Sequence, residues 1–337
     1  MSTQDERAAL IEAFLDAAGW PRAARSLLAA DASFRRYDRI VRGAQRAVLM
    51  DAPPPRENVR AFLTVARQLL DLGLSAPRPL HADETQGLLL LEDFGDRTFT
   101  RALAGGAEEA ALYRLAIDVL IALHRAWRPG MSADLPPYDD RKLLDEAALL
   151  TDWFLPAIRG RETPATVRAA YLEAWRAVLP KARAAPNSLV LRDYHVDNLM
   201  LLEGRSGIAG CGVLDFQDAV VGPRSYDVAS LLEDARRDIT PGIVTAMLDR
   251  YLAAFPELDR AAFLDSYAVL GAQRAAKIVG IFTRLDRRDG KPHYLRHIPR
   301  VWRLLSAGLE KPVLAPVKAW FDREVPQAER IAPEPKP

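Results

Sequence analysis

The order of apolar and polar positions predicts a mixed helix-and-strand architecture for the first third of the chain. Residues 5–18 carry apolar side chains at helical spacing, which predicts a first helix ending at Gly19. A second, short helix is expected over residues 22–30. Next come a turn, a strand, a turn at Gly43 and a second strand, so this segment is expected to form a hairpin.

A further helix and two further strands follow, and the composition changes after Gly95. A helix is predicted through residues 59–70, followed by a proline-led strand, a turn and an apolar strand within residues 76–95. Beyond Gly95 the segment 188–222 is the one strand-like part. The remainder predicts long helices over 107–128, 139–159, 164–184, 225–236, 241–254, 260–284 and 294–308.

These elements predict an α+β, bilobal fold. We expect a small sheet-bearing nucleotide-binding lobe at residues 1–94, a larger and mostly helical catalytic and acceptor-binding lobe at 95–325, and a disordered tail at 326–337. The chain has 337 residues, of which 49% are apolar and 27% are charged, as is usual for a globular protein of this size.

Charge and cysteine content narrow the class of protein. The net charge of +1 favours neither nucleic acid nor a membrane surface as a partner. Cys211 is the only cysteine, so an internal disulfide framework is excluded and a reducing cytosol is expected. The N-terminus lacks the pattern of a signal peptide, and no apolar run reaches the roughly 18 residues of a membrane span. We expect a cytoplasmic monomer.

A polar stretch at the centre of the strand-like segment carries the candidate chemistry. Within "LRDYHVDNLM", residues 191–200, Asp193 and Asn198 are five positions apart, and Asp215 follows an apolar run in "GVLDFQDA". Phosphoryl transfer needs a carboxylate beside the attacking hydroxyl and hard oxygen ligands that hold Mg²⁺ across the phosphates. We expect Asp193 as the base or orienting group and Asn198 and Asp215 as metal ligands, converging between the lobes.

A plainer interpretation exists for each of these residues. Aspartate and asparagine are common turn formers, so any one of the three alone is better explained as a turn cap. Their order and spacing after a small hairpin-bearing lobe favour phosphoryl transfer for the set.

The same residues resemble the aminoglycoside phosphotransferase family, whose members are relatives of protein kinases. Its His-Gly-Asp-x-x-x-x-Asn motif corresponds to the segment from Leu191 to Asn198, and its Ile-Asp-Trp/Phe motif to the segment around Asp215. The resemblance runs from about residue 25 to residue 310 and implies a kinase that uses ATP and Mg²⁺. It places His195 on a second histidine of the family loop and Asp227 on a family aspartate that begins a helix.

Two departures from the family pattern matter. Leu191 stands where the first family histidine is expected. The group that this histidine orients must therefore be held by another residue, for instance Arg192. No lysine precedes Lys142, although a kinase-like small lobe usually carries one on its third strand, and the aligned residue is Met50. Either magnesium and arginine replace the lysine, or the protein binds nucleotide without turning it over.

The resemblance also implies a set of nucleotide contacts. They are Ser33, Phe34, Arg35, Arg36 and Met50 in the first hairpin and Glu92, Asp93 and Phe94 in the hinge strand, whose backbone takes the adenine edge. Arg39 is a further source of charge for the phosphates. Strand alternation places Arg36 on the opposite face from Arg35 and Arg39, so some of these arginines are expected to be solvated.

An excess of positive charge in the second lobe indicates the chemical class of the acceptor. Residues 270–304 contain nine lysines and arginines against two aspartates, whereas an aminoglycoside, being a polycation, calls for carboxylates. A basic pocket suits an acceptor that carries a carboxylate. The alternative is that many of these charges form a solvated helix face.

One subfamily matches in more detail. The segments "DASFRRY", "VLMDAPP", "LEDFGDRTF" and "QRAAKIVGIFTRL" resemble bacterial kinases that phosphorylate the anomeric (C1) hydroxyl of N-acetylmuramate and N-acetylglucosamine in peptidoglycan recycling toward UDP-sugars. This resemblance makes Met50 a subfamily trait. It implies sugar contacts by Arg192, His195, Arg224, Glu233, Asp234, Arg237, Arg274 and Lys277, although "EDARRD" also suits a salt-bridge network at a helix end.

Two other functions stay open. One is a kinase of the same fold for another small alcohol, such as an aminoglycoside, choline or homoserine. The other is a catalytically silent nucleotide-binding protein, suggested by Met50. The presence of Asp193, Asn198 and Asp215 counts against the silent protein.

Overall fold

The computed structural model describes residues 3–30 and 35–336, which form two compact units. The first unit comprises residues 1–115 and 196–219, and the second comprises residues 116–195 and 220–337. The chain therefore changes unit after Leu115, after His195 and after Ala219. Each unit is described by itself below.

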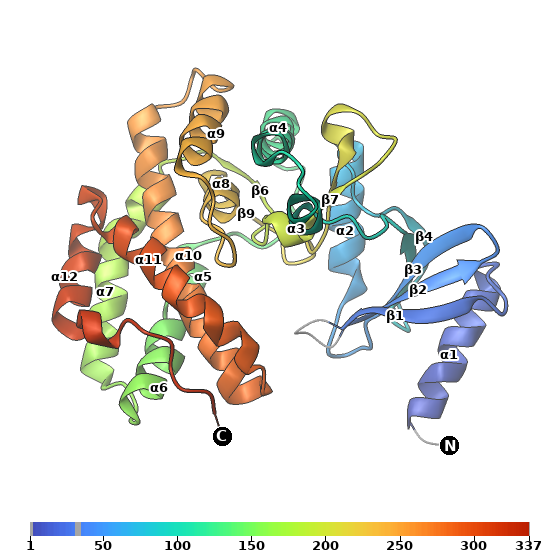
Figure 1. The fold of residues 1–337 in the computed structure, drawn as a ribbon, viewed down its shortest axis with the longest axis horizontal. Helices are drawn as coiled ribbons and strands as arrows, with labels where there is room; N and C mark the ends of the chain where they lie inside the picture. The colour runs from blue at the N-terminus through green and yellow to red at the C-terminus, as the bar shows by residue number, and fades with distance from the viewer. Residues whose placement is uncertain (1–2, 31–34, 337) are drawn as a thin grey trace. The chain divides into compact units, whose positions relative to one another are not determined.

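A five-stranded antiparallel sheet forms the centre of the first unit (Figure 1). Its strands are β1 (Ala24–Ala30), β2 (Arg36–Arg42), β3 (Gln45–Asp51), β4 (Pro79–Asp83) and β5 (Leu88–Glu92), in the order β1-β2-β3-β5-β4. The predicted hairpin and the two later strands are confirmed. The predicted helix over residues 22–30 is wrong, because this segment pairs with β2 as an edge strand. Sheet pairing outweighs the helix propensity of its alanines and leucines.

The two faces of this sheet differ, as strand alternation requires. One face packs on α1 (Thr3–Ala17) and buries Ile40, Leu49 and Leu90 against Ile11 and Phe14. Residues at the alternate positions, such as Val48 and Leu91, point to the other face. That second face contributes to the cavity described below.

The remaining elements of the first unit are α2 (Val59–Asp71), α3 (Phe99–Ala104), the start of α4 (Glu109–Ala126), β7 (Leu199–Leu201) and β8 (Cys211–Val213). Of these, α2, α3 and β7 contribute residues to the cavity. The side chain of Asn58 caps the N-terminus of α2 by accepting the N–H of Arg60. Single bridges join Ser75 to Gly212 and Thr98 to Met200, so segments distant in sequence meet around the β7–β8 hairpin.

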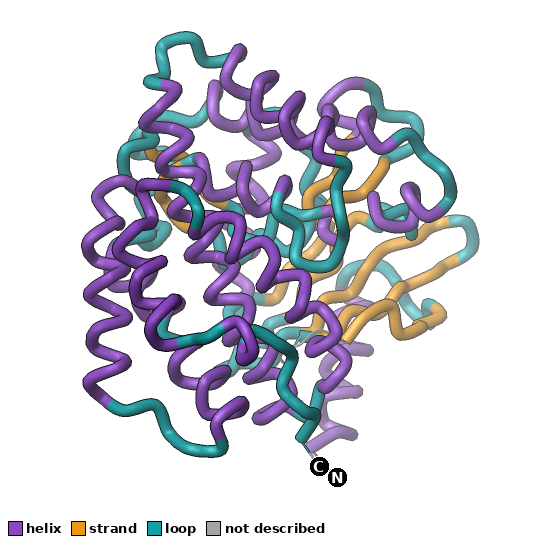
Figure 2. Tube along the Cα trace, turned by 60° about the vertical axis from the view of Figure 1, so that its left-hand side comes forward, coloured by secondary structure: helices purple, strands orange, loops and turns teal. Residues whose placement is uncertain are grey.

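The second unit is mostly helical (Figure 2). Its helices are α5 (Asp140–Ala147), α6 (Leu155–Arg159), α7 (Ala165–Ala182), α8 (Ser225–Leu232), α9 (Pro241–Ala253), α10 (Arg260–Asp289), α11 (Ile298–Leu309) and α12 (Ala315–Glu324), and β6 (Asn187–Val190) pairs with β9 (Val220–Pro223). The predicted helices are confirmed, whereas α3 and α12 were not predicted.

Helix α10 is the centre of the second unit's core. Its apolar residues, such as Val279 and Phe282, belong to one buried cluster with residues of α7, α11 and α12. A Cβ atom at Gly280 would lie 2.3 Å from the carbonyl carbon of Leu149, so glycine permits α10 to approach the π-helical turn at Leu150–Phe154.

The C-terminal segment follows α12. A 3₁₀ turn covers Gln327–Glu329, and residues 332–336 carry no regular secondary structure. The backbone N–H of Lys336 donates to Asp286 of α10 at 3.1 Å. Across residues 3–30 and 35–336, no helix combines the length and the apolar character needed to cross a membrane.

Candidate active site

A cavity of about 440 Å³ lies within the first unit, between the second face of the sheet and the β7–β8 hairpin. Its wall combines apolar side chains with a few polar ones, namely Leu28, Val48, Leu91, Met200 and Leu214 together with Asp93, Asn198 and Asp215. Ligand cavities commonly have this composition, with apolar surface for a ring and a few polar groups that fix its orientation.

Two of the predicted polar residues meet in this cavity. Asn198 ends a 3₁₀ turn just before β7, and Asp215 follows β8, where its φ of 56° lies in the left-handed region. The backbone N–H of Leu214 donates to the carbonyl of Asn198 at 2.9 Å, which holds the two chain segments together. The Asn198 amide Nδ2 lies 3.4 Å from Asp215 Oδ2, and Gln217 Nε2 donates to Asp215 Oδ1 at 2.7 Å.

The chemistry of this pair fits magnesium. The amide oxygen of Asn198 and the carboxylate of Asp215 are hard oxygen donors, and Mg²⁺ is usually held by one or two such groups together with water and substrate phosphates. The described residues contain no cluster of three or more histidine, cysteine or acidic side chains arranged to hold a metal. Neighbouring Asp197 accepts a hydrogen bond from Thr100 in α3.

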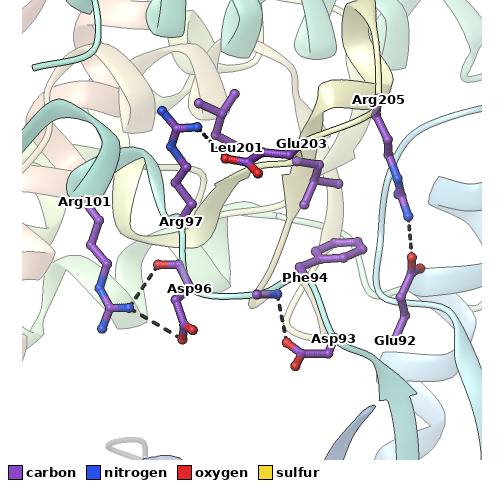
Figure 3. A pocket seen from close by; sticks show the side chains of 11 residues that line it. Glu92, Asp93, Phe94, Asp96, Arg97, Arg101, Leu201, Glu203 and Arg205 are labelled. Atoms are coloured by element: carbon purple, nitrogen blue, oxygen red, sulfur yellow. Dashed lines mark hydrogen bonds and ion pairs between the residues drawn. The ribbon is translucent and has the colours of Figure 1, made fainter. Parts of the chain in front are cut away.

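The side chains of the hinge are tied into the unit by ion pairs (Figure 3). Glu92 pairs with Arg205 from the β7–β8 hairpin, and Asp93 accepts the N–H of Gly95 at 2.8 Å. Asp93 also accepts a hydrogen bond from the guanidinium of Arg39, at 2.7 Å. Both hinge carboxylates are therefore engaged within the protein. A second cavity of about 590 Å³ is lined by the hinge and Arg205.

Phe94 is positioned by an unusually close neighbour. A Cβ atom at Gly212 of β8 would lie 2.7 Å from its ring, and the Arg205 guanidinium lies 5.3 Å from the ring centre. Only glycine therefore leaves room for Phe94 against β8. The ring lines both cavities in this orientation.

The arginines of the first hairpin have separate environments. Arg36 pairs with Asp38 at 3.0 Å and is 54% exposed, and it does not line the cavity. Arg39 contacts Asp93 and Asp96 of the hinge. The carboxylates of the hinge attract it there, a contact between distant segments that alternation alone does not predict.

The other predicted residues of the small lobe are Arg35, Met50, Ser33 and Phe34. Arg35 is buried near Glu57 and Asp215. Met50 is buried in β3, opposite Tyr37 and Leu89. Ser33 and Phe34 lie outside the described residues.

In the second unit, Asp227 holds the turn that presents Asp193. Its carboxylate accepts the backbone N–H of Leu191 at 2.6 Å and of Arg192 at 2.9 Å. Arg192 adopts a φ of 70°, and its carbonyl accepts the hydroxyl of Ser230 at 3.1 Å. Burial raises the pKa of Asp227 to about 7, although the two N–H groups act in the opposite direction. Asp227 thus fixes the loop from the start of α8.

The environment of Asp193 keeps its carboxylate ionised. Burial raises its pKa, but the charges of Lys277, Arg274 and Arg192 outweigh burial and hold the pKa below its ordinary value. Burial and the neighbouring charge of Arg236 lower the pKa of His195 to about 4, so this imidazole is neutral near pH 7.

Glu146 of α5 organises the cations beside Asp193. It forms ion pairs with Arg192 and, at 3.0 Å, with Lys277, and it accepts the hydroxyl of Tyr138. Burial raises the pKa of Glu146, but the charges of Lys277 and Arg192 lower it below its ordinary value. Sequence reasoning missed Glu146, because an acidic residue within a helix carries no signal of its buried partners.

The other predicted sugar contacts have different neighbours. Arg274 is buried, and its side chain makes no ion pair or hydrogen bond among the described residues. Arg224 lies over the ring of Phe255 at 4.4 Å, and Glu233 fits beside Gly271, where a Cβ atom would lie 2.6 Å from its carboxylate. Burial raises the pKa of Glu233 to about 7.

Asp234 and Arg237 complete the predicted set. Asp234 accepts the backbone N–H of Arg236 at 2.7 Å, as a residue that shapes a turn does. The Nε atom of Arg237 is buried. The structure thus brings Asp193, His195, Arg192, Arg274 and Lys277 together electrostatically. The charge of Arg274 also acts on Glu233 and that of Asp234 acts on His195, while Arg224 contacts Phe255.

Comparison with known sequences gives one consistent result. Residues 25–264 match a family model described as "Phosphotransferase enzyme family". A Caulobacter vibrioides protein named N-acetylmuramate/N-acetylglucosamine kinase is 41% identical, over 97% of this chain and 99% of that protein. Proteins of the same name from Pseudomonas aeruginosa and Neisseria meningitidis are 38% and 39% identical, over 89% and 81% of this chain and the same shares of those proteins.

Solved structures share the fold at low identity. A choline/ethanolamine kinase family protein from Mesorhizobium loti aligns with a TM-score of 0.60 and 14% identity, over 94% of this chain and all of that chain. An ADP-bound aminoglycoside phosphotransferase, APH(2'')-Ib, aligns with a TM-score of 0.58 and 17% identity, over 89% of this chain and 96% of that chain. The predicted α+β, protein-kinase-like fold class is confirmed.

Proposed function

Because this chain belongs to the phosphotransferase enzyme family, we propose that it transfers the γ-phosphate of ATP to the anomeric C1 hydroxyl of N-acetylmuramate, N-acetylglucosamine or both. The products are ADP and the sugar 1-phosphate. The reaction belongs to peptidoglycan recycling toward UDP-sugars and takes place in the cytoplasm, where ATP is available.

One observation carries this proposal. Four proteins named N-acetylmuramate/N-acetylglucosamine kinase are 37–41% identical to this chain over 81–97% of its length. The site supports the same reaction class, because the cavity of the first unit combines apolar walls with the paired oxygen donors of Asn198 and Asp215.

The residues then have separate roles. Asp193 accepts the proton of the C1 hydroxyl, the C1 oxygen forms a bond to the γ-phosphorus, and the bond from that phosphorus to the β–γ bridging oxygen breaks. An anomeric hydroxyl is more acidic than an ordinary sugar alcohol, so a carboxylate of low pKa is sufficient for a late proton transfer.

A metal ion would complete the part of the site that binds the phosphate donor, ATP. Asn198 and Asp215 would hold Mg²⁺, which when bound neutralises the charge of the phosphates. The apolar side chains Val48, Leu91 and Met200 accept the faces of the adenine ring, and the hinge backbone at Glu92–Phe94 takes its edge.

On the acceptor side, Arg274 is the residue best suited to a carboxylate. Its guanidinium is buried near Asp193, whose pKa it lowers, so it carries positive charge close to the proposed base. N-acetylmuramate differs from N-acetylglucosamine by a lactyl group that ends in a carboxylate. We assign Arg274 to that carboxylate, with Lys277 and Arg192 held by Glu146 nearby.

The test is ADP release by the purified protein with MgATP and four acceptors: N-acetylmuramate, N-acetylglucosamine, kanamycin and choline. Release with either sugar, together with phosphorus NMR that shows a 1-phosphate, supports the proposal. Release with kanamycin or choline but neither sugar overturns it and favours a kinase for another small alcohol. Absence of release with every acceptor overturns it in favour of a silent nucleotide-binding protein.

A further inference from the structure

Glu146 of α5 is the common partner of two largely buried cations in the second unit. Its carboxylate forms an ion pair with Arg192 and lies 3.0 Å from Lys277 Nζ of α10, and the three side chains are only 9–14% exposed. The hydroxyl of Tyr138 donates to the same carboxylate. Glu146 therefore ties α5 both to α10 and to the loop that carries Asp193.

The ion pair with Arg192 fixes the residue directly before Asp193. The backbone N–H of Arg192 donates to Asp227 at 2.9 Å, and its φ of 70° lies in the left-handed region, which is uncommon for a residue other than glycine. Its side chain is held separately, by Glu146. The backbone and the side chain of Arg192 are thus anchored to different helices, α8 and α5, and Asp193 follows from a backbone that is held on two sides.

Lys277 is the second cation that Glu146 holds, and its position bears directly on Asp193. Burial raises the pKa of Asp193, and among the charges that lower it below its ordinary value that of Lys277 acts most strongly. The ammonium itself contacts Glu146 at 3.0 Å and donates to the hydroxyl of Tyr226 at 3.4 Å. Because a buried ammonium without an anion is costly, loss of Glu146 would drive Lys277 toward the nearby carboxylate of Asp193. There it would compete with the acceptor hydroxyl for the base.

We propose that Glu146 is a positioning residue for phosphate transfer, which holds Arg192 and Lys277 in place so that the ammonium does not neutralise Asp193. This inference rests on the proposed function, because it takes Asp193 as the base. Glu146 acts through the two cations and takes no part in the bond changes at phosphorus. The role depends on its charge, since a neutral side chain of the same shape would leave Lys277 without its anion.

The test compares kcat for ADP release, at saturating MgATP and acceptor, between the wild type and Glu146→Gln. The acceptor is whichever of N-acetylmuramate, N-acetylglucosamine, kanamycin and choline the wild type uses fastest. We expect kcat to fall roughly tenfold to a hundredfold, because misplacement of a reacting group by about 1 Å can cost about a hundredfold. Asp145→Asn, at an exposed neighbour in the same helix, is the matched control and should keep the wild-type kcat.

Two further measurements separate this role from support of the fold. Calorimetry with MgATP counts the folded molecules in each preparation, and Glu146→Gln should keep the wild-type dissociation constant because the candidate nucleotide cavity lies within the first unit. The double variant Glu146→Gln/Lys277→Met removes the ammonium together with its anion, while the glutamine amide oxygen can still accept from Arg192. Its kcat should therefore exceed that of Glu146→Gln and lie within about fivefold of the wild type.

An unchanged kcat per folded molecule in Glu146→Gln overturns the proposal, and so does a double variant that is no faster than Glu146→Gln. Should Glu146→Gln fail to fold, Glu146→Asp takes its place. It keeps the charge on a shorter side chain that cannot reach both cations equally well, so kcat per folded molecule should fall by about threefold or more. A wild-type kcat in Glu146→Asp would then overturn the proposal.

These outcomes are separable from the proposed function. A wild type that uses only kanamycin or choline contradicts the proposed function, while the role of Glu146 is still measured with that acceptor. Conversely, sugar phosphorylation by the wild type together with an unaffected Glu146→Gln contradicts only the role of Glu146. A wild type that uses no acceptor overturns both.

Discussion

The carboxylate of Asp227 accepts the backbone N–H of Arg192 at 2.9 Å, inside the second unit. The same carboxylate accepts the N–H of Leu191, the residue that stands where the family pattern has a histidine. An acidic side chain at the start of α8 therefore fixes the backbone just before Asp193. Arg192, which was expected to take over the orienting role, instead directs its side chain to Glu146.

Replacement of Asp227 by asparagine should weaken this turn. At about pH 8 the wild-type carboxylate is ionised and accepts both N–H groups, whereas the amide directs an N–H donor at one of them. We expect the free energy of unfolding to fall by about 1–3 kcal/mol, with a lower kcat. Urea denaturation measures the first effect. Asp249→Asn, at an exposed residue, is the control, and equal stability of the two variants would contradict the assigned role.

Asp193→Ala should abolish turnover and leave nucleotide binding intact. The loss of a general base costs on the order of 10²- to 10⁴-fold in kcat, while the candidate nucleotide cavity lies within the other unit. Steady-state ADP release and MgATP calorimetry measure the two quantities. Asp197→Ala removes a second aspartate of the same loop, one that accepts from Thr100, and should reduce kcat far less. Full activity of Asp193→Ala would show that another group accepts the proton.

Arg274→Met should separate the two sugars. If Arg274 binds the lactyl carboxylate, kcat/KM for N-acetylmuramate falls roughly tenfold to a hundredfold, while that for N-acetylglucosamine changes little. Competition between the two sugars in one reaction measures the ratio directly. Arg288→Met, in the same helix at an exposed position, is the control. Equal losses for both sugars would mean that Arg274 supports the site without recognising the carboxylate.

Gly212→Ala should displace Phe94 from the hinge. The added Cβ atom would lie 2.7 Å from the ring, a contact that forces the ring or β8 to move. We expect a loss of about 1–3 kcal/mol in the free energy of unfolding and weaker adenosine binding. Gly242→Ala, in α9, meets no atom within 4 Å and should be neutral or slightly stabilising. Wild-type adenosine affinity in Gly212→Ala would rule out a role for Phe94 in shaping the cavity.

His124 should contribute to loss of stability in acid. Burial and the charge of Arg224 lower its pKa to about 3, and its Nδ1 atom lies 2.7 Å from the hydroxyl of Tyr251. Because the pKa of His124 is lower in the folded than in the unfolded protein, neutral His124 stabilises the fold fully above the unfolded pKa of about 6.5. This stabilisation is lost as the pH falls toward 3.

Comparison of the wild type with His124→Asn isolates this effect. The stability advantage of the wild type should shrink by about 1.4 kcal/mol per pH unit below about pH 6.5. His195 also has a lowered pKa, but it is present in both proteins, so its contribution to the difference in stability cancels. An advantage that stays constant down to about pH 5 would show that His124 is protonated in the folded protein.

The local spacing of apolar residues was sufficient to predict most of the secondary structure. Apolar spacing predicted α1, α2, the β2–β3 hairpin and α10, because a repeat of apolar positions depends only on neighbours in sequence. It failed at β1, whose alanines and leucines favour a helix until β2 offers backbone partners. The short helix α3 follows a capping residue, Thr98, but is too brief for a periodic signal.

The sequence by itself determined the kind of chemistry: the types and order of Asp193, Asn198 and Asp215, and the lack of a lysine before Lys142, are all visible in the chain. Only the tertiary structure decided which charges meet. It placed Arg39 at the hinge, Arg35 between Glu57 and Asp215, and Glu146 between two cations. The physical reason is the distance along the chain over which each effect acts. Periodicity and turn formation depend on neighbours in sequence. The partner of a buried charge, in contrast, is set by the packing of segments that are distant in sequence.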